Sequence, residues 1–371
     1  MPIRVLEFYS GIGGLHLALS RSGIGSEVVQ ALDWDQNACL VYNANHGNNV
    51  AKKIDISTLT TAQLASYHAD LWLLSPACQP YTVLNPNAKG AQDPRAQSFL
   101  HLVQVVLPEL AASNNHPDRM LVENVAGFED SSTRQILISS LRALGYETLE
   151  LLLTPLQFGI PNSRLRYYLL AKKAPLRFSD IPSGYSGEVW RQIPGQGLAW
   201  TDPRLDERGA ASDDVVRELR EYLDKDDQEG QYDVPDKVLQ KWGRLFDIVK
   251  PSSRRTCCFT RGYTQLVERA GSILQENEEL DTTEIFDHFL ASQAAGDPDA
   301  VKLLHPLKLR YFSPPELLRI FAFDPIEDPT KTGALAWPKT TSRKSKYKFI
   351  GNSINVEVVQ KLIRYLFLEP K

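Results

Sequence analysis

A single cysteine, Cys78, follows the apolar run 71–74 within the stretch SPACQPYT. Four apolar residues in succession indicate a short buried strand, so the thiol is expected on the loop where that strand ends. Pro76 and Pro80 bracket the cysteine and restrict the backbone on both sides. A thiol in this position is either a small buried hydrophobe or a nucleophile at the mouth of a site.

A glycine-rich stretch, FYSGIGG, follows the first strand-like run and precedes a helix-like run. Glycines let the backbone turn tightly and approach a ligand closely, and the helix N-terminus behind them favours a negative group such as a carboxylate. Taken alone, the motif is equally consistent with a plain tight turn. Its candidate cofactor-binding residues are Phe8, Ser10, Gly11, Ile12, Gly13 and Gly14.

Acidic residues end the next two strand-like runs. Asp33 can hold the two hydroxyls of a ribose, while the indole of Trp34 covers an adenine face. Asp55, followed by Ile56, can bind the exocyclic amine of the same adenine. Each acid alone is typical of an ordinary strand end. Together they predict a nucleoside site along the carboxyl ends of consecutive strands, where ligands of open α/β sheets bind.

A carboxyl group and two guanidinium groups complete the set. Glu123 follows a strand-like run on the sheet edge expected to carry Cys78, which makes it a candidate acid. Arg164 and Arg166 lie two positions apart in an extended segment, so they face the same way and can bind a phosphate or a base carbonyl. The ordinary alternatives are a solvated glutamate and a surface salt-bridge pair.

Strand-like and helix-like runs alternate through the first 172 residues and would position these groups. The expected strands are 3–8, 28–32, 50–54, 71–74, 120–122, 147–153 and 166–171, and the expected helices are 15–22, 36–45, 98–110 and 133–144. The third helix is expected to end near Pro108. This alternation predicts βαβ units, and hence an α/β fold with a doubly wound, mainly parallel sheet.

The composition of the chain changes after Lys173. Residues 202–236 and 276–300 are crowded with Asp and Glu and are expected to be flexible, solvated insertions. Helical pattern returns in SPPELLRIFAF, with Ser313 as the N-cap and Pro314 at the first helical position. The expected organisation is a catalytic domain beginning with 1–172, a smaller domain at 173–305, and a return to the catalytic domain at 306–371.

The 371-residue chain is 43% hydrophobic and 23% charged, which is ordinary for a globular protein. It shows neither a bilayer-spanning apolar run nor a signal peptide, so we expect an intracellular protein with no membrane partner. The four cysteines lack metal-ligand spacing, and no metal is expected. Because the net charge is −4, a nucleic acid would have to be held by local basic patches.

The order of these motifs resembles the cytosine C5-methyltransferases that use S-adenosylmethionine. The matching stretches are FYSGIGG, the acid after the second strand, Pro-x-Cys-Gln, Glu-Asn-Val, Asn-Ser-Arg-Leu-Arg and the C-terminal Gly-Asn-Ser. CCFTRGYT, IPNSRLRYY and LRYFSPPELLRIFAF make the chain most similar to the tRNA-aspartate branch, historically grouped with DNA methyltransferases. The resemblance leaves out both acidic stretches. Ala77 departs from the family, which usually has proline at that position.

The resemblance implies a Rossmann-like fold and a smaller target-recognition domain at 173–305. It implies that Cys78 attacks carbon 6 of cytosine, that Glu123 assists at ring nitrogen 3, and that Arg164 and Arg166 hold the base, Arg166 at its carbonyl. Further implied cofactor contacts are Ser75, Asn352 and Ser353. The expected RNA contacts, with Tyr263 stacking on a loop base, are Gln79, Asn124, Arg254, Arg255, Cys258, Phe259, Thr260, Tyr263, Lys344, Lys346 and Lys348.

The implied substrate is cytosine 38 in the anticodon loop of tRNA-Asp, methylated by a monomer in the cytoplasm or nucleus. Two alternatives stay open. A DNA cytosine-5 methyltransferase would be favoured by a long base-reading domain, and the modest, acidic middle region here ranks it below tRNA. A weakly active or non-catalytic nucleic-acid-binding relative is the other alternative, against which both Cys78 and Glu123 are present.

Overall fold

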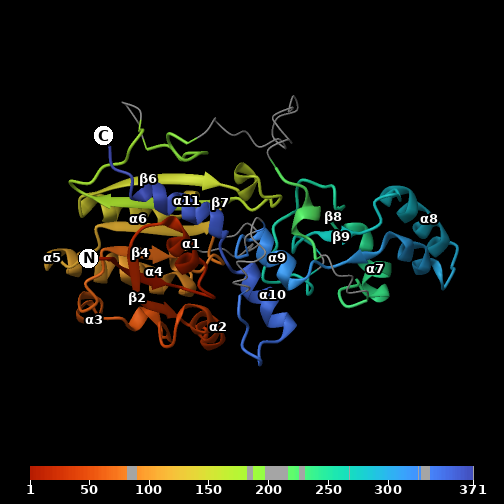
Figure 1. The fold of residues 1–371 in the computed structure, drawn as a ribbon, viewed down its shortest axis with the longest axis horizontal. Coiled ribbons are helices and arrows are strands. Elements are labelled where there is room, and N and C mark those ends of the chain that lie inside the picture. The colour runs from red at the N-terminus through yellow and green to blue at the C-terminus, as the bar shows by residue number, and fades with distance from the viewer. Residues whose placement is uncertain are drawn as a thin grey trace.

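The computed structural model describes residues 1–81, 90–181, 187–196, 216–224, 230–266, 268–324, 326 and 335–370. Figure 1 shows a large sheet covered by helices and, beside it, a smaller lobe built on short strands. No helix within these described ranges is long and apolar enough to cross a bilayer.

The large sheet has seven strands in the order β3-β2-β1-β4-β5-β7-β6. The strands are β1 (Ile3–Phe8), β2 (Ser26–Asp33), β3 (Ala51–Lys53), β4 (Leu71–Leu74), β5 (Arg119–Val125), β6 (Tyr146–Leu153) and β7 (Arg166–Lys173). The first five pair in parallel, whereas β7 is antiparallel to both of its neighbours. The predicted α/β fold with a mainly parallel sheet is therefore confirmed.

Helices cover both faces of this sheet because its strands are apolar on both sides. Val5 and Leu6 are successive residues of β1 and enter two different buried clusters. The first cluster includes side chains of α1 (Gly14–Ser22), α2 (Gln36–His46) and α11 (Val356–Leu366). The second includes side chains of α3 (Thr61–Ala65), α4 (Gln97–His101), α5 (Leu107–Ala112) and α6 (Ser132–Ala143).

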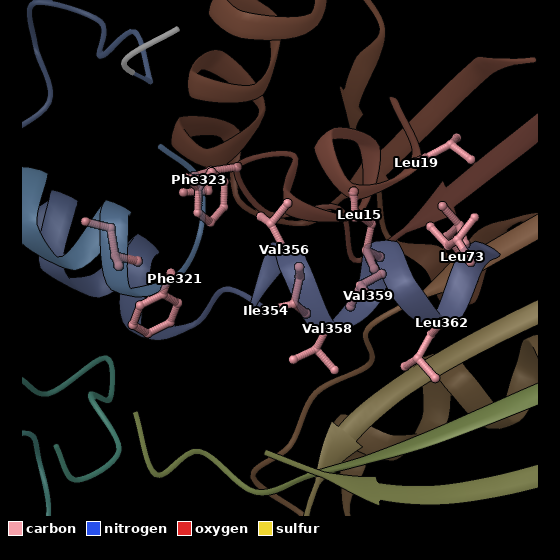
Figure 2. Close-up of a cluster of buried hydrophobic side chains, with 14 of the residues drawn as sticks. Leu15, Leu19, Leu73, Phe321, Phe323, Ile354, Val356, Val358, Val359 and Leu362 are labelled. Atoms are coloured by element: carbon pink, nitrogen blue, oxygen red, sulfur yellow. The ribbon is translucent and has the colours of Figure 1, made fainter. Parts of the chain in front are cut away.

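The C-terminal helix α11 completes the first of these faces. Figure 2 shows Val356, Val359 and Leu362 of this helix beside Leu15 of α1 and Leu73 of β4. All five side chains are buried in the same cluster. The end of the chain is thus part of the core that supports the first strands.

The expectation that the helix at 98–110 would end near Pro108 is wrong. The chain stays helical from Gln97 to Ala112, with a π-helical stretch, Leu102–Val106, between α4 and α5. Pro108 lies within the first two positions of α5. Proline is tolerated in the first turn of a helix, and the π-helical stretch before it changes the pattern of backbone hydrogen bonds.

The smaller lobe contains a three-stranded sheet of order β10-β9-β8. Its elements are α7 (Asp236–Trp242), β8 (Ile248–Val249), β9 (Ile273–Gln275), α8 (Thr282–Ala294) and β10 (Leu309–Arg310). The small sheet therefore includes two residues beyond position 305. Between the lobe and the large sheet lie α9 (Pro314–Ile320) and α10 (Arg343–Gly351), and Ser313 caps α9 as predicted.

The acidic stretches are more ordered than their composition predicts. Within 276–300, helix α8 buries Phe286 and Phe289 in an apolar cluster, so the expectation of a solvated insertion is wrong there. In the other stretch, Leu219 and Tyr222 are also buried. A few apolar residues at helical spacing can anchor an otherwise polar segment. Residues 202–215 and 225–229 of that stretch lie outside the described residues.

Candidate active site

The residues singled out by type converge at one edge of the large sheet. Phe8, Leu74 and Val122 are register partners on β1, β4 and β5, which run in the same direction. The glycine loop, the thiol loop and Glu123 come directly after these positions. The backbone N–H of Ser75 donates to the Phe8 carbonyl (3.3 Å), which ties the starts of the first two loops together.

The glycine loop is held by the acid that ends β2. Asp33 accepts the backbone N–H of Gly11 through Oδ2 (2.8 Å) and that of Asp35 through Oδ1 (2.7 Å). Burial raises the pKa of this carboxyl above its usual range. Gly11 and Gly13 have φ angles of +54° and +91°, which are left-handed values that favour glycine. Asp33 therefore shapes the loop as well as the nucleoside site expected beside it.

The two glycines face different surroundings. A Cβ at Gly11 would have no heavy atom within 4 Å, whereas a Cβ at Gly13 would lie 2.3 Å from Nε2 of His46. Gly11 thus borders open space, while Gly13 allows the loop to pack on α2. The side chains of Phe8 and Ile12 are buried in the two apolar clusters, so only the backbone of these two residues is free to border a ligand.

A polar network beneath the loop was not anticipated from the sequence. The hydroxyl of Tyr42 donates to Oε2 of Glu7 (2.7 Å) and lies 2.7 Å from Nδ1 of His16, whose ring stacks on His46 at 4.1 Å. Burial raises the pKa of Glu7 to about 8 and lowers the pKa values of His16 to about 3 and His46 to about 4. These residues come from β1, α1 and α2, and no local motif links them.

The remaining nucleoside-binding candidates surround the same loop. Trp34 is 67% exposed, with Nζ of Lys53 5.8 Å from its ring centroid, and the Asp55 carboxylate accepts the N–H of Ser57 (2.9 Å). The buried Ser10 hydroxyl has no partner among the described residues. An exposed indole, an unpartnered hydroxyl and open space over Gly11 fit a nucleoside cofactor with a polar head group.

The C-terminal Gly-Asn-Ser segment returns to this loop, as the resemblance implies. A Cβ at Gly14 would lie 3.0 Å from Cγ1 of Ile354, so the segment packs directly on the first turn of α1. Asn352 is exposed at the end of α10, and the Ser353 carbonyl accepts a hydrogen bond from Arg164 (2.6 Å).

The thiol loop is fixed by β5. The side-chain amide of Asn124 donates to the Pro76 carbonyl (3.2 Å), and the Tyr81 N–H donates to the Cys78 carbonyl (3.0 Å). Asn124 is only 1% exposed, so the expectation that it contacts substrate is replaced by a positioning role. These bonds restrain the loop on both sides of Ala77, where the family pattern has proline.

Cys78, Glu123 and Arg166 lie in one cluster, which is the candidate chemical centre. Nε of Arg166 lies 3.6 Å from Oε1 of Glu123, whose Oε2 accepts the Ser75 hydroxyl (2.8 Å). Burial raises the pKa of the Cys78 thiol, and the nearby Arg166 opposes that shift. The thiol, the carboxyl and one guanidinium therefore share a half-buried site beside the glycine loop. Gln79 is half-buried next to the thiol.

Arg164 has a different environment from Arg166. It is buried, and its guanidinium donates to the carbonyls of Phe259 (2.8 Å), Gly351 (3.1 Å) and Ser353 (2.6 Å). It therefore joins the segment before β7 to the small lobe and to the C-terminal segment. We correct its expected role from base contact to positioning, because these carbonyls occupy its terminal nitrogens.

A second thiol, Cys258, lies within the same charged cluster. Its Sγ is 3.4 Å from Arg164 and 3.5 Å from Arg166. Burial alone would raise the pKa of this thiol, but the two guanidinium groups lower it. The backbone of Thr260 meets α10, because a Cβ at Gly351 would lie 2.3 Å from the Thr260 carbonyl carbon.

The expected RNA contacts of Tyr263 and Phe259 are wrong, because both side chains are buried within the protein. Tyr263 is 2% exposed, and its hydroxyl donates to the Ser272 carbonyl (2.8 Å), so it cannot stack on a base. Phe259 is fully buried beside it, at 5.1 Å between ring centroids. Arg254 and Arg255 remain on the surface, where they pair with Glu218 (3.3 Å) and Asp247 (2.9 Å) respectively, and their assignment to RNA binding stays a prediction.

The lysines of α10 are more accessible. Lys344 is exposed, Nζ of Lys346 lies 5.6 Å from the centroid of the Trp337 ring, and Lys348 pairs with Asp35 at 2.8 Å. The last contact joins α10 to the N-cap of α2, next to the expected nucleoside site. Their assignment to RNA binding stays a prediction.

Comparison with known proteins finds relatives along the whole chain. The family described as C-5 cytosine-specific DNA methylase matches residues 3–367. The tRNA (cytosine(38)-C(5))-methyltransferases of Schizosaccharomyces pombe and Homo sapiens are 40% and 36% identical, over 99% of this chain and 97% and 99% of their own lengths. A Dictyostelium discoideum DNA (cytosine-5)-methyltransferase is 34% identical over 98% of this chain and 94% of its own. The crystal structure of the S. pombe Dnmt2 methyltransferase has a TM-score of 0.75 at 38% identity, covering 99% of this chain and 98% of that one.

Proposed function

Because this chain belongs to the C-5 cytosine-specific methylase family and is therefore a cytosine C5-methyltransferase, we propose that it methylates a cytosine in tRNA, using S-adenosylmethionine. The observation that carries the chemistry is the grouping of Cys78, Glu123 and Arg166 beside the glycine loop, with 3.6 Å between the last two side chains. The names of the full-length relatives support tRNA as the substrate.

The proposed cofactor site uses the residues whose surroundings fit it. The backbone of the glycine loop and the Ser10 hydroxyl would hold the polar head group, and Asp33 and Trp34 would hold the nucleoside. S-adenosylmethionine supplies an electrophilic methyl group when it is bound.

The chain's own side chains then act on the cytosine. The Cys78 thiolate adds to carbon 6, which places electron density on carbon 5 and makes that atom nucleophilic. Glu123 hydrogen-bonds at ring nitrogen 3 and Arg166 at the ring carbonyl, so both stabilise the charge that develops on the ring. Once carbon 5 is methylated, loss of its proton and departure of Cys78 restore the aromatic ring. The target base must leave its stack to reach these groups.

We further propose that the target is cytosine 38 in the anticodon loop of tRNA-Asp, in the cytoplasm or nucleus, and that the protein acts as a monomer. The proposal for position 38 rests on the names of the S. pombe and human relatives. An exposed loop suits the chemistry because its bases are already unpaired and cost less energy to extrude.

Methylation of DNA is the second candidate, favoured by the name of the D. discoideum relative. Both are tested by incubating the protein with methyl-labelled S-adenosylmethionine and either total tRNA or duplex DNA. We expect label in tRNA, lost when cytosine 38 of tRNA-Asp is replaced by uracil. Equal or greater labelling of duplex DNA would instead support the second candidate.

A further inference from the structure

Helix α7 and the turn after it carry three exposed cations. Lys237 and Lys241 are four residues apart in α7, which places them on one face of that helix. Arg244 lies in the short 3-10 turn, Gly243–Leu245, that follows the helix, and it lines a hollow together with Lys241. We refer to these three residues as the α7 cation row. It lies in the small lobe, outside the thiol site and outside every motif singled out in the sequence.

The row differs from many other cations of the lobe in having no acidic partner. No ion pair joins any of its three residues to a carboxylate within the described ranges. Lobe cations that are paired with a carboxylate at 4.0 Å or less include Arg220, Arg254, Arg255, Lys302 and Arg310. Three neighbouring like charges repel one another in the free protein, and a bound anion would remove that repulsion.

A hollow of about 170 Å³ lies between α7 and α8, at the Lys241–Arg244 end of this row. Lys241 and Arg244 line it together with Gln240 and Gln293, and none of its lining residues is acidic. The side-chain amide of Gln293 donates to the Gln240 carbonyl (3.3 Å), which ties α8 to α7 at this hollow. Gly243 allows the turn to approach α8, because a Cβ there would lie 3.0 Å from Cε1 of Phe286. Two cations with no neighbouring carboxylate are groups that bind a phosphate.

The position of the row suits a long anionic ligand. Strands β1 to β5 run parallel, and their carboxyl ends carry Cys78 and Glu123 on the side of the sheet that faces the small lobe (Figure 1). Helix α7 lies on that side, beyond α9 and α10 (Figure 1). A nucleic acid whose loop enters the thiol site would therefore extend its adjoining stem toward the lobe.

We propose that the α7 cation row binds the phosphodiester backbone of the tRNA stem next to the target loop, with one phosphate in the hollow between α7 and α8. This proposal rests on the proposed function. The proposed contacts are to the phosphates of the RNA, so the affinity that they supply depends on salt concentration and not on base sequence.

The test compares the parent with the triple variant Lys237→Ala, Lys241→Ala, Arg244→Ala. The Kd for full-length tRNA, measured by fluorescence anisotropy, should rise about tenfold or more at low salt. The slope of log K against log salt should become shallower by about two, because each lost phosphate contact removes about 0.7–0.9. The rate at saturating tRNA and the affinity for a hairpin with only a few stem base pairs should stay as in the parent.

Two controls separate charge from folding. Lys302→Ala removes an exposed cation of the same lobe that is already paired with Asp299 (2.7 Å), and it should leave the salt slope unchanged. The charge-keeping variant Lys237→Arg, Lys241→Arg, Arg244→Lys should retain binding. An unchanged slope in the alanine variant, or equal losses on the short hairpin, would overturn the proposal while leaving tRNA methylation intact. Parent protein that methylates duplex DNA and not tRNA would overturn the proposed function as well.

Discussion

At the scale of single residues, the site contains two thiols with opposite electrostatic situations. Arg166 is close to both, but its guanidinium lies 3.5 Å from the Cys258 sulfur. The pKa of Cys258 is lowered by its two arginines despite its burial, while burial raises that of Cys78. The proposed nucleophile is thus mostly a neutral thiol in the free protein, and forming its thiolate is part of the reaction cost.

We therefore expect kcat/KM for tRNA to increase with pH. Below a raised thiol pKa, the thiolate fraction grows about tenfold for each pH unit, so a rise should persist from about pH 6.5 to 8.5. Steady-state kinetics across that range, with saturating cofactor, measure this rise in kcat/KM.

Cys78→Ala should abolish methyl transfer, while the affinity for S-adenosylmethionine measured by calorimetry is retained. A pH-independent rate, or an active alanine variant, would contradict the assignment.

A second residue-scale prediction concerns the thiol loop. Asn124→Ala removes the hydrogen bond to the Pro76 carbonyl and should lower the single-turnover rate by roughly 10–100-fold, because a misplaced nucleophile loses its alignment. Cofactor affinity should be unchanged.

Adding Ala77→Pro to this variant should restore part of the lost rate, since proline restrains the same loop through its own backbone. In the parent, Ala77→Pro should change little because the loop is already held on both sides. The proposal for Asn124 fails if the double variant is no faster than Asn124→Ala alone.

At the scale of elements, the site depends on close contact between α10 and the segment that carries Cys258. Gly351 ends α10, and Arg164 links its carbonyl to that of Phe259. Three chain segments that are far apart in sequence are thereby held at one point. Gly-Asn-Ser therefore packs against both the Cys258 segment and the proposed cofactor site.

Gly351→Ala tests that contact. The added methyl group would lie 2.3 Å from the Thr260 carbonyl carbon, so backbone atoms must move apart. Overpacking of this kind costs about 1–3 kcal/mol, and we expect a lower Tm together with loss of activity. Gly25→Ala is the matched control, because a Cβ there meets no heavy atom within 4 Å. Equal Tm values for the two variants would show that the contact is not needed.

At the scale of the whole molecule, the network beneath the glycine loop couples folding to protonation. The folded state raises the pKa of Glu7 from 4.5 to about 8, so it binds more protons than the unfolded chain between these values. That contribution to stability is present at low pH and is lost as pH rises through 8. His16 and His46 have lowered pKa values, so their contribution is lost as pH falls below 6.5.

The two effects oppose each other between pH 4.5 and 6.5, and only the Glu7 effect acts above that window. We expect the free energy of unfolding to fall between pH 6.5 and 8, with a slope of at most about 1.4 kcal/mol per pH unit. Glu7→Gln keeps the side chain uncharged and should flatten this part of the curve. Urea titrations at several pH values measure it, and identical slopes in both proteins would contradict the expectation.

The sequence by itself determined the α/β class, the strands β1, β2 and β4, and the placement of Cys78 and Glu123 at one edge of the sheet, whereas both arginines were assigned through the family resemblance. Buried parallel strands read as short apolar runs, and a fold of this class brings the loops after those strands together at one edge of the sheet. Local signals therefore sufficed to place the proposed nucleophile and acid at one edge of the sheet. The cap of α9 was also predictable from local sequence. The side chains of Ser313 and Glu316, three positions apart, each accept a hydrogen bond from the other residue's backbone N–H.

Only the tertiary structure decided which polar and aromatic residues remain available to a ligand. Tyr263 and Asn124 have the right chemistry for substrate contact, but packing buries both and uses their polar atoms. Arg164 and Arg166 lie two positions apart in the sequence, yet only Arg164 donates hydrogen bonds to the carbonyls of three distant residues. The network of Glu7, Tyr42 and the two histidines had no sequence signal, because its members come from three elements. Burial and hydrogen-bond pairing depend on distant segments, so no local pattern encodes them.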